Sequence, residues 1–119
     1  MSDSLGEIAK SLRIFADQRD WEQFHSIKNL VLALVGEVGE VAELVQWKSD
    51  QEVTAWLGND DGKSQLGEEL ADVLMYVVRL GDIAGLDLRA EVRRKIQLNA
   101  ERYPIDKSFG NATKHTGLR

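Results

Sequence analysis

Two groups of acidic residues have the types and the spacing that can hold a cation. Glu37 and Glu40 lie three residues apart in a segment with helical periodicity, so their carboxylates share one face, about one turn apart. Glu68, Glu69 and Asp72 follow in a second such segment, where Asp72 can pair with either glutamate by geometry alone. Apolar residues flank both groups, which favours a mostly buried setting. The two groups therefore form a candidate cation site.

The chemistry of the donors narrows the choice of cation. Carboxylates that converge inside a protein raise one another's pKa values unless a cation neutralises them. The chain has no cysteine, and neither of its two histidines is near the acids in the sequence. A donor set made only of oxygen prefers Mg²⁺, Mn²⁺ or Ca²⁺ to zinc. Because carboxylates and substrate phosphates commonly bind Mg²⁺ jointly, the pattern points to phosphoryl chemistry.

The simpler alternative is that these acids form ordinary solvated helix faces, which are common at this spacing. Gly36 and Gly39, however, interleave with the acids, and each costs a helix interior about 1 kcal/mol relative to alanine. Glycine there would let another backbone or a ligand approach closely. Together, the glycines and the apolar flanks support the cation site as strongly as the common spacing supports a solvated face.

Capping and stop signals divide the chain into the helical segments that must position the acids. The long segments are expected to begin after residues that can cap a helix N-terminus: Ser4 (with Glu7 in a capping-box pattern), Ser26, Ser64 and Asp87. The second long segment is expected over 27–47, the third from Ser64 to about residue 84 with Gly85 as its C-cap, and the fourth to about residue 102. Residues 20–25 and 58–62 are expected to be loops, residues 52–57 a helical turn or two, and about 105–119 a polar tail.

No stretch alternates apolar and polar residues with the turn chemistry of a hairpin, so strands are not expected. We therefore predict an all-α fold: one domain over residues 1–119, with its helices in an antiparallel four-helix bundle. The stretch from Val73 to Val78 is apolar almost all the way round, and a chain of 119 residues can hardly surround such a helix alone. This predicts a homo-oligomer.

The composition excludes several classes of function. Apolar residues make up 43% and charged residues 29% of a chain with net charge −5. Residues 1–88 carry 17 acidic and 7 basic side chains, a net −10, which disfavours a nucleic-acid partner; residues 89–119 carry 3 and 8, a net +5. The longest apolar run, Leu30 to Val35, is too short for a membrane span. The lack of cysteine and of a signal-peptide pattern favours the cytoplasm.

The acidic motifs and their surroundings resemble the MazG-like all-α NTP pyrophosphatase superfamily, most closely its compact dCTP pyrophosphatase branch. The signature E-x-x-E followed by E-x-x-D is matched by Glu37 to Glu40 and by Glu69 to Asp72. Further matching segments occur in the same order at 19–25, 32–40, 43–48, 68–74 and 99–104. The resemblance covers about residues 5–118, and the ordered set is specific where a lone E-x-x-E would be weak.

The resemblance implies hydrolysis of a (deoxy)nucleoside triphosphate to the monophosphate and pyrophosphate, with dCTP or 5-modified dCTP as substrate and sanitation of the nucleotide pool as purpose. It implies Mg²⁺, with Mn²⁺ as a substitute, at four residues that are both metal ligands and catalytic: Glu37, Glu40, Glu69 and Asp72. Glu68 is left as a supporting acid. A water activated by metal or carboxylate would attack the α-phosphorus, and Glu40 is our choice to orient it. A tetramer made of two dimers is also implied.

The same resemblance implies six substrate-binding residues: Trp21, His25, Trp47, Tyr76, Lys95 and Asn99. The first four would contact the base, and Lys95 and Asn99 would lie towards the phosphates or the sugar. Without the resemblance, the tryptophans and Tyr76 would be read as core or interface residues and His25 as a hydrogen-bonded loop residue.

Two rival functions follow from the same residues. A carboxylate-bridged di-iron bundle needs Glu-x-x-His on two helices. The chain has that spacing at Glu22 to His25, within an expected loop, whereas Ala112 stands three residues before His115. The second rival is a non-enzymatic helical oligomerisation module whose acids form an interface cluster. A pyrophosphatase with a different base preference is a further alternative.

Overall fold

A computed structural model describes residues 4–118, and all regular secondary structure within that range is helical. The elements are α1 (Leu5–Gln18), η1 (Glu22–Phe24), α2 (Ile27–Val45), α3 (Asp50–Leu57), α4 (Asp60–Ile83), α5 (Leu88–Arg102), α6 (Ile105–Ser108) and η2 (His115–Gly117). The described residues fall into two compact units, the first ending at Leu86 and the second beginning at Asp87. The prediction of an all-α fold is confirmed.

Side-chain caps explain where the helices begin. The hydroxyl oxygens of Ser4 and Ser26 accept hydrogen bonds from the backbone three residues later, at 3.1 Å in each case, and so does a carboxylate oxygen of Asp87 at the start of α5. A full capping box between Ser49 and Glu52 opens α3, so this helix begins at Asp50, two residues before the predicted residue 52. These caps satisfy backbone N–H groups that a helix N-terminus leaves without partners.

The third long helix was predicted to begin at Ser64, which is wrong. Helix α4 begins at Asp60, after Asn59 as N-cap, so only Gly58 and Asn59 of the expected loop 58–62 lie outside a helix. Two acids, Asp60 and Asp61, stand in the first turn, where the helix dipole favours negative charge. This favourable start outweighs the helix-breaking tendency of the glycines beside it.

The end of α4 is set by a glycine, as expected. Gly85 has φ +72°, which a residue with a side chain rarely adopts. The Leu86 N–H donates to the Gly81 carbonyl at 2.8 Å and the Gly85 N–H to the Asp82 carbonyl at 3.2 Å, which is the Schellman arrangement. Helix α2 was predicted to end at Trp47, but it ends two residues earlier, at Val45.

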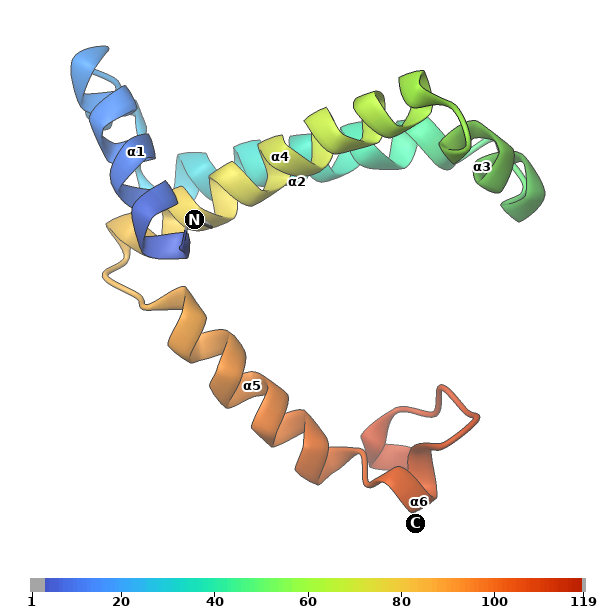
Figure 1. The fold of residues 1–119 in the computed structure, drawn as a ribbon. Coiled ribbons are helices and arrows are strands. Elements are labelled where there is room, and N and C mark those ends of the chain that lie inside the picture. The colour runs from blue at the N-terminus through green and yellow to red at the C-terminus, as the bar shows by residue number, and fades with distance from the viewer. Residues whose placement is uncertain (1–3, 119) are drawn as a thin grey trace. The chain divides into compact units, whose positions relative to one another are not determined.

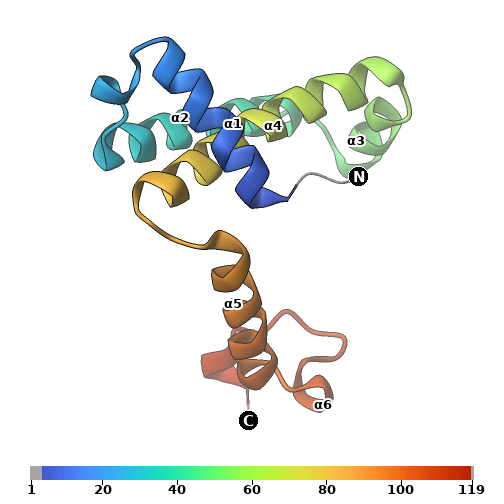
Figure 2. The same cartoon turned by 60° about the vertical axis from the view of Figure 1, so that its left-hand side comes forward.

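Helices α2 and α4 lie side by side and antiparallel, and α3 connects them at one end (Figures 1 and 2). Helix α1 packs on the opposite end of α4 (Figure 1). Helix α5 belongs to the second unit, so the four-helix bundle stays a prediction.

Few side chains of the first unit are fully buried. Ala16, Leu30 and Val78 form its apolar core, each with 2% exposure. By contrast, large apolar side chains on both long helices stay exposed, including Val31, Leu32, Val35 and Val38 on α2 and Leu70 and Leu74 on α4. Exposed apolar surface of this extent on neighbouring helices is typical of an interaction surface. Among the described residues, no helix is long and apolar enough to cross a membrane.

The turn between α3 and α4 generates a stability prediction. A Cβ added at Gly62 would overlap the backbone carbonyl of Trp56, whereas a Cβ at Gly67, also in α4, meets nothing within 4 Å. We expect Gly62→Ala to lower the free energy of unfolding by about 1–3 kcal/mol, because the backbone at Gly62 must move away from that of Trp56. We expect Gly67→Ala to raise it by about 0.5–1 kcal/mol through helix propensity. Urea unfolding measures both, and an equal change in the two variants would contradict this packing.

Candidate functional site

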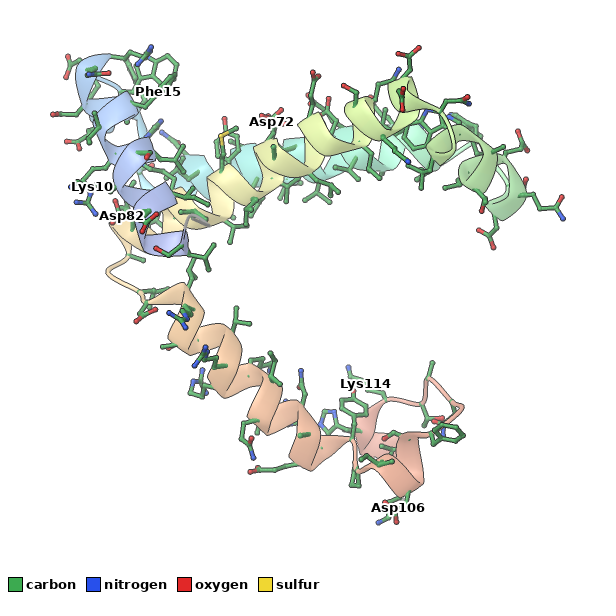
Figure 3. The ribbon with its side chains drawn as sticks, viewed as in Figure 1. Lys10, Phe15, Asp72, Asp82, Asp106 and Lys114 are labelled. Atoms are coloured by element: carbon green, nitrogen blue, oxygen red, sulfur yellow. The ribbon has the colours of Figure 1, made fainter. Side chains whose placement is uncertain are left out.

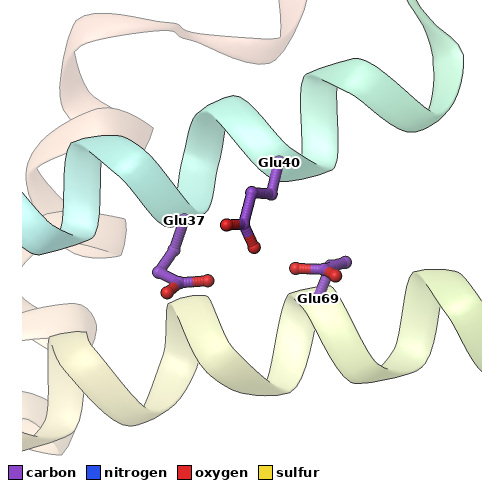
Figure 4. Close-up of side chains that lie close together, drawn as sticks. All are labelled: Glu37, Glu40 and Glu69. Carbon is purple, nitrogen blue, oxygen red and sulfur yellow. The ribbon is translucent and has the colours of Figure 1, made fainter.

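The packing of α2 against α4 brings the acids of the two motifs together. Glu37 and Glu40 project from α2 and Glu69 projects from α4, and their carboxylates converge between the helices (Figure 4). Each offers one oxygen, and these three oxygens all lie within 4.8 Å of one another. A separation of this size can be bridged by one cation held by carboxylates from two helices.

The electrostatics show the cost of this arrangement without a cation. Burial is the largest cause that raises the pKa of Glu37, followed by the negative charges of Glu40 and Asp72. For Glu69, hydrogen bonding to Glu40 is the largest cause of a raised pKa, followed by burial and the charges of its acidic neighbours. Ionising these groups together is therefore unfavourable, and a bound cation would reverse that.

Two carboxylate oxygens have no partner within the described chain. Glu37 Oε2 and Glu69 Oε2 are buried and accept no hydrogen bond. Buried polar atoms without a partner are rare in proteins, and a metal ion is one of the usual reasons for them. The donor set of the cluster consists of carboxylate oxygens, so its residues fit a hard divalent cation such as Mg²⁺ or Mn²⁺.

Asp72, the fourth predicted ligand, lies midway along α4 (Figure 3). It is not among the three residues whose oxygens lie within 4.8 Å of one another. Its charge nevertheless raises the pKa values of Glu37 and Glu69, and it is half-buried beside Glu37. Glu68 is exposed and lies outside the cluster.

A cavity of about 220 Å³ adjoins the acids, and Glu37 and Asp72 form part of its wall. The rest of its lining is aromatic or apolar apart from one arginine: Leu12, Phe15, Ala16, Trp21, His25, Leu30, Met75, Tyr76 and Arg79. Trp21 packs edge-on against Phe15, with ring centroids 5.7 Å apart, and against His25 at 6.3 Å. A cavity with aromatic walls and a few polar groups at one end is suited to a flat heteroaromatic ring.

Three of the six predicted substrate-binding residues line this cavity: Trp21, His25 and Tyr76. Trp47 does not; it follows the end of α2 and is 87% exposed. Lys95 and Asn99 lie about one turn apart on α5, in the second unit, and both are exposed. The roles of these three residues stay predictions.

Sequence reasoning missed Arg79 and the α1 side of the cavity. Arg79 is 6% exposed, and it interrupts the apolar stretch of α4 as a lone cation, a signal that marks a buried charge. Leu12 and Phe15 fit the apolar stripe of α1, so spacing cannot tell a cavity wall from a core.

The Glu22 and His25 pair of the di-iron alternative has other partners. Glu22 lies 3.8 Å from the Arg79 guanidinium, and His25 Nδ1 accepts a hydrogen bond from Arg79. Within residues 4–118 the acidic cluster contains no histidine.

Comparison with known proteins adds independent findings. The MazG-like family model matches residues 32–118. The dCTP pyrophosphatase 1 of Rattus norvegicus is 48% identical over 97% of this chain and 68% of that protein, and the one of Homo sapiens is 44% identical over the same shares. The crystal structure of a pyrophosphatase from Archaeoglobus fulgidus is similar with a TM-score of 0.78 and 35% identity, over 87% of this chain and 95% of that chain.

Proposed function

Because this chain belongs to the MazG-like family and is a nucleoside triphosphate pyrophosphatase, we propose that it hydrolyses dCTP or a 5-modified dCTP to the monophosphate and pyrophosphate. The reaction depends on Mg²⁺, takes place in the cytoplasm and clears non-standard nucleotides from the pool. The observation that carries the metal dependence is the set of three carboxylates within 4.8 Å, two of them with buried oxygens that lack a partner.

The proposed cation site consists of Glu37, Glu40, Glu69 and Asp72. Oxygens of the first three lie within 4.8 Å of one another, and Asp72 lines the cavity together with Glu37. When bound, Mg²⁺ supplies charge neutralisation for the phosphates and the leaving pyrophosphate. Glu40 is the most exposed of the three clustered acids, and it borders both other carboxylates. We assign to Glu40 the role of orienting the attacking water and accepting its proton, since a general base must reach solvent as well as the reacting atoms.

The base binds in the aromatic cavity, next to Glu37 and Asp72. Trp21 and Tyr76 offer ring faces for stacking, and the Tyr76 hydroxyl and His25 offer hydrogen bonds. Trp47 contributes a further ring surface to the base. Lys95 and Asn99 bind the phosphates or the sugar, in keeping with the net charge of +5 over residues 89–119.

A nucleotide panel tests the proposed function. With Mg²⁺ and each of the common dNTPs, the wild type is expected to release monophosphate and pyrophosphate, fastest with dCTP or its 5-modified forms. Glu37→Gln and Asp72→Asn are expected to lower kcat/KM by more than about 100-fold. Substituting even the groups that hydrogen-bond to metal ligands typically lowers metal affinity or activity by about 10- to 100-fold. Chromatographic quantification of both products measures this.

Glu68→Gln is the matched control for the panel, since Glu68 is an exposed acid next to Glu69 on the same helix. Its turnover should equal that of the wild type. Wild-type turnover in Glu37→Gln and Asp72→Asn would overturn the metal site. A strong preference for another base would overturn only the assignment of dCTP and would leave the metal site standing.

We also propose that the chain assembles as a homo-oligomer, a tetramer made of two dimers. The exposed apolar side chains of α2 and α4 support this, because covering them with another copy of the chain removes apolar surface from water. Among the described residues of the first unit, only three apolar side chains are buried.

Light scattering is expected to give a mass about four times 13.4 kDa for the wild type. Leu32→Glu, at a side chain that is 61% exposed on α2, is expected to lower that mass because a charge would be buried in the interface. Ser11→Glu, on the exposed side of α1, serves as the control. A wild-type mass of 13.4 kDa would refute the assembly.

A further inference from the structure

Arg79 is the one charged side chain among the described residues that is buried, and it is held from several sides. Its Nη1 lies 3.4 Å from a carboxylate oxygen of Asp82, and its Nη2 lies 3.8 Å from one of Glu22. Asp82 in turn accepts two hydrogen bonds from the Arg13 guanidinium, at 2.9 and 2.7 Å. Arg79 thereby connects α4 to α1 and η1 and has little freedom to move.

The remaining contact of Arg79 determines the chemistry of His25. Arg79 Nε donates to His25 Nδ1 at 3.2 Å. A guanidinium has only donors and does not lose its proton in proteins, so the nitrogen it contacts must be an acceptor. His25 is then neutral, with its proton on Nε2.

The second nitrogen of His25 is free to serve a ligand. No hydrogen bond from Nε2 to a protein atom is present within residues 4–118. His25 lines the aromatic cavity together with Trp21 and Tyr76. A second hollow beside His25 is lined mainly by the Arg79 network: Arg13, Glu22, Arg79, Asp82 and Ile83. Since Nδ1 faces that network, the Nε2–H is directed away from it.

We propose that Arg79 is a positioning residue that holds His25 as the Nε2–H tautomer, so that His25 donates a hydrogen bond to an acceptor of a pyrimidine base in the aromatic cavity. This inference rests on the proposed function, because it assumes that the cavity binds the base. The O2 carbonyl of a pyrimidine, and N3 of cytosine, are acceptors of the required kind.

The groups that face His25 favour its neutral form. Burial is the largest cause that lowers the pKa of His25, and the positive charge of Arg79 lowers it further. Glu22 raises this pKa as the smallest of the three causes. Nearby, Asp82 pairs with both Arg13 and Arg79. The donor is therefore in place at neutral pH.

Imidazole ¹⁵N NMR measures the tautomer directly. The chain has two histidines, so a His115→Gln background leaves His25 as the only signal. We expect the proton on Nε2 in that background, a mixture of both tautomers in Arg79→Met, and recovery of the Nε2–H form in Arg79→Lys, which again supplies only donors. A proton on Nδ1 in the parent, or an unchanged tautomer in Arg79→Met, would overturn the positioning role.

Titration with dCMP, which is not a triphosphate and cannot be hydrolysed, tests the donor role without turnover. The Nε2–H resonance of His25 should shift saturably, and an unchanged resonance at saturating dCMP would overturn that role. A shift combined with no hydrolysis of any dNTP would instead refute the proposed pyrophosphatase function and leave the inference about His25 standing. The two failures are thus distinguishable.

Two substitutions at His25 separate the donor from the acceptor. In His25→Asn the amide oxygen can replace Nδ1 as the acceptor for Arg79, but no donor reaches the Nε2 position. In His25→Gln the amide nitrogen can replace the Nε2–H. We expect His25→Asn to raise KM for dCTP by about 10-fold with kcat changed less than about 3-fold, the effect of one lost hydrogen bond. His25→Gln should raise KM less than His25→Asn does, because it keeps a donor near the Nε2 position, and equal effects of both substitutions would overturn the donor assignment.

Discussion

The interaction on which the rest of the structure depends is the repulsion between carboxylates that α2 and α4 hold together. Helix packing holds one oxygen each of Glu37, Glu40 and Glu69 within 4.8 Å of one another. Burial raises the pKa of Glu37 and hydrogen bonding to Glu40 raises that of Glu69, and the neighbouring negative charges raise both further. Such an arrangement persists only if the helices are secured elsewhere. The capping box at Ser49 stabilises α3, which connects α2 and α4 at one end, and the Schellman arrangement at Gly85 ends α4 at the other.

The acids and the aromatic cavity form one continuous site in which charge and apolar surface are separated. Glu37 and Asp72 line the cavity, which supports the proposal that a nucleotide places its phosphates at the acids and its base among the aromatic rings. Arg79 lies at the far end, away from the cluster, where Asp82 and Glu22 balance its charge. This separation lets a cation occupy the acids without competition from a neighbouring guanidinium.

Local chemistry made much of the fold predictable, because caps at Ser4, Ser26 and Asp87 and the stop at Gly85 act within a few residues. The start of α4 was not predictable in this way. Gly62 is typical of a loop in the sequence, and its close contact with Trp56 becomes known only from the structure. Spacing on α4 left Glu68 and Glu69 equivalent; only the family resemblance favoured Glu69, which faces α2 in the structure (Figure 4). The partners of Arg79 come from α1, η1 and α4, and no pattern within one segment reveals such a contact.

Direct measurement of cation binding tests the central claim, that the clustered acids are a divalent-cation site. Metal-free protein is titrated with Mn²⁺, and free Mn²⁺ is followed by electron paramagnetic resonance. The wild type should bind Mn²⁺ saturably, Mg²⁺ should displace it, and Glu69→Gln should weaken binding by at least about 10-fold while Glu68→Gln leaves it unchanged. Unsaturable binding by the wild type, or equal affinity in Glu69→Gln, would contradict the account.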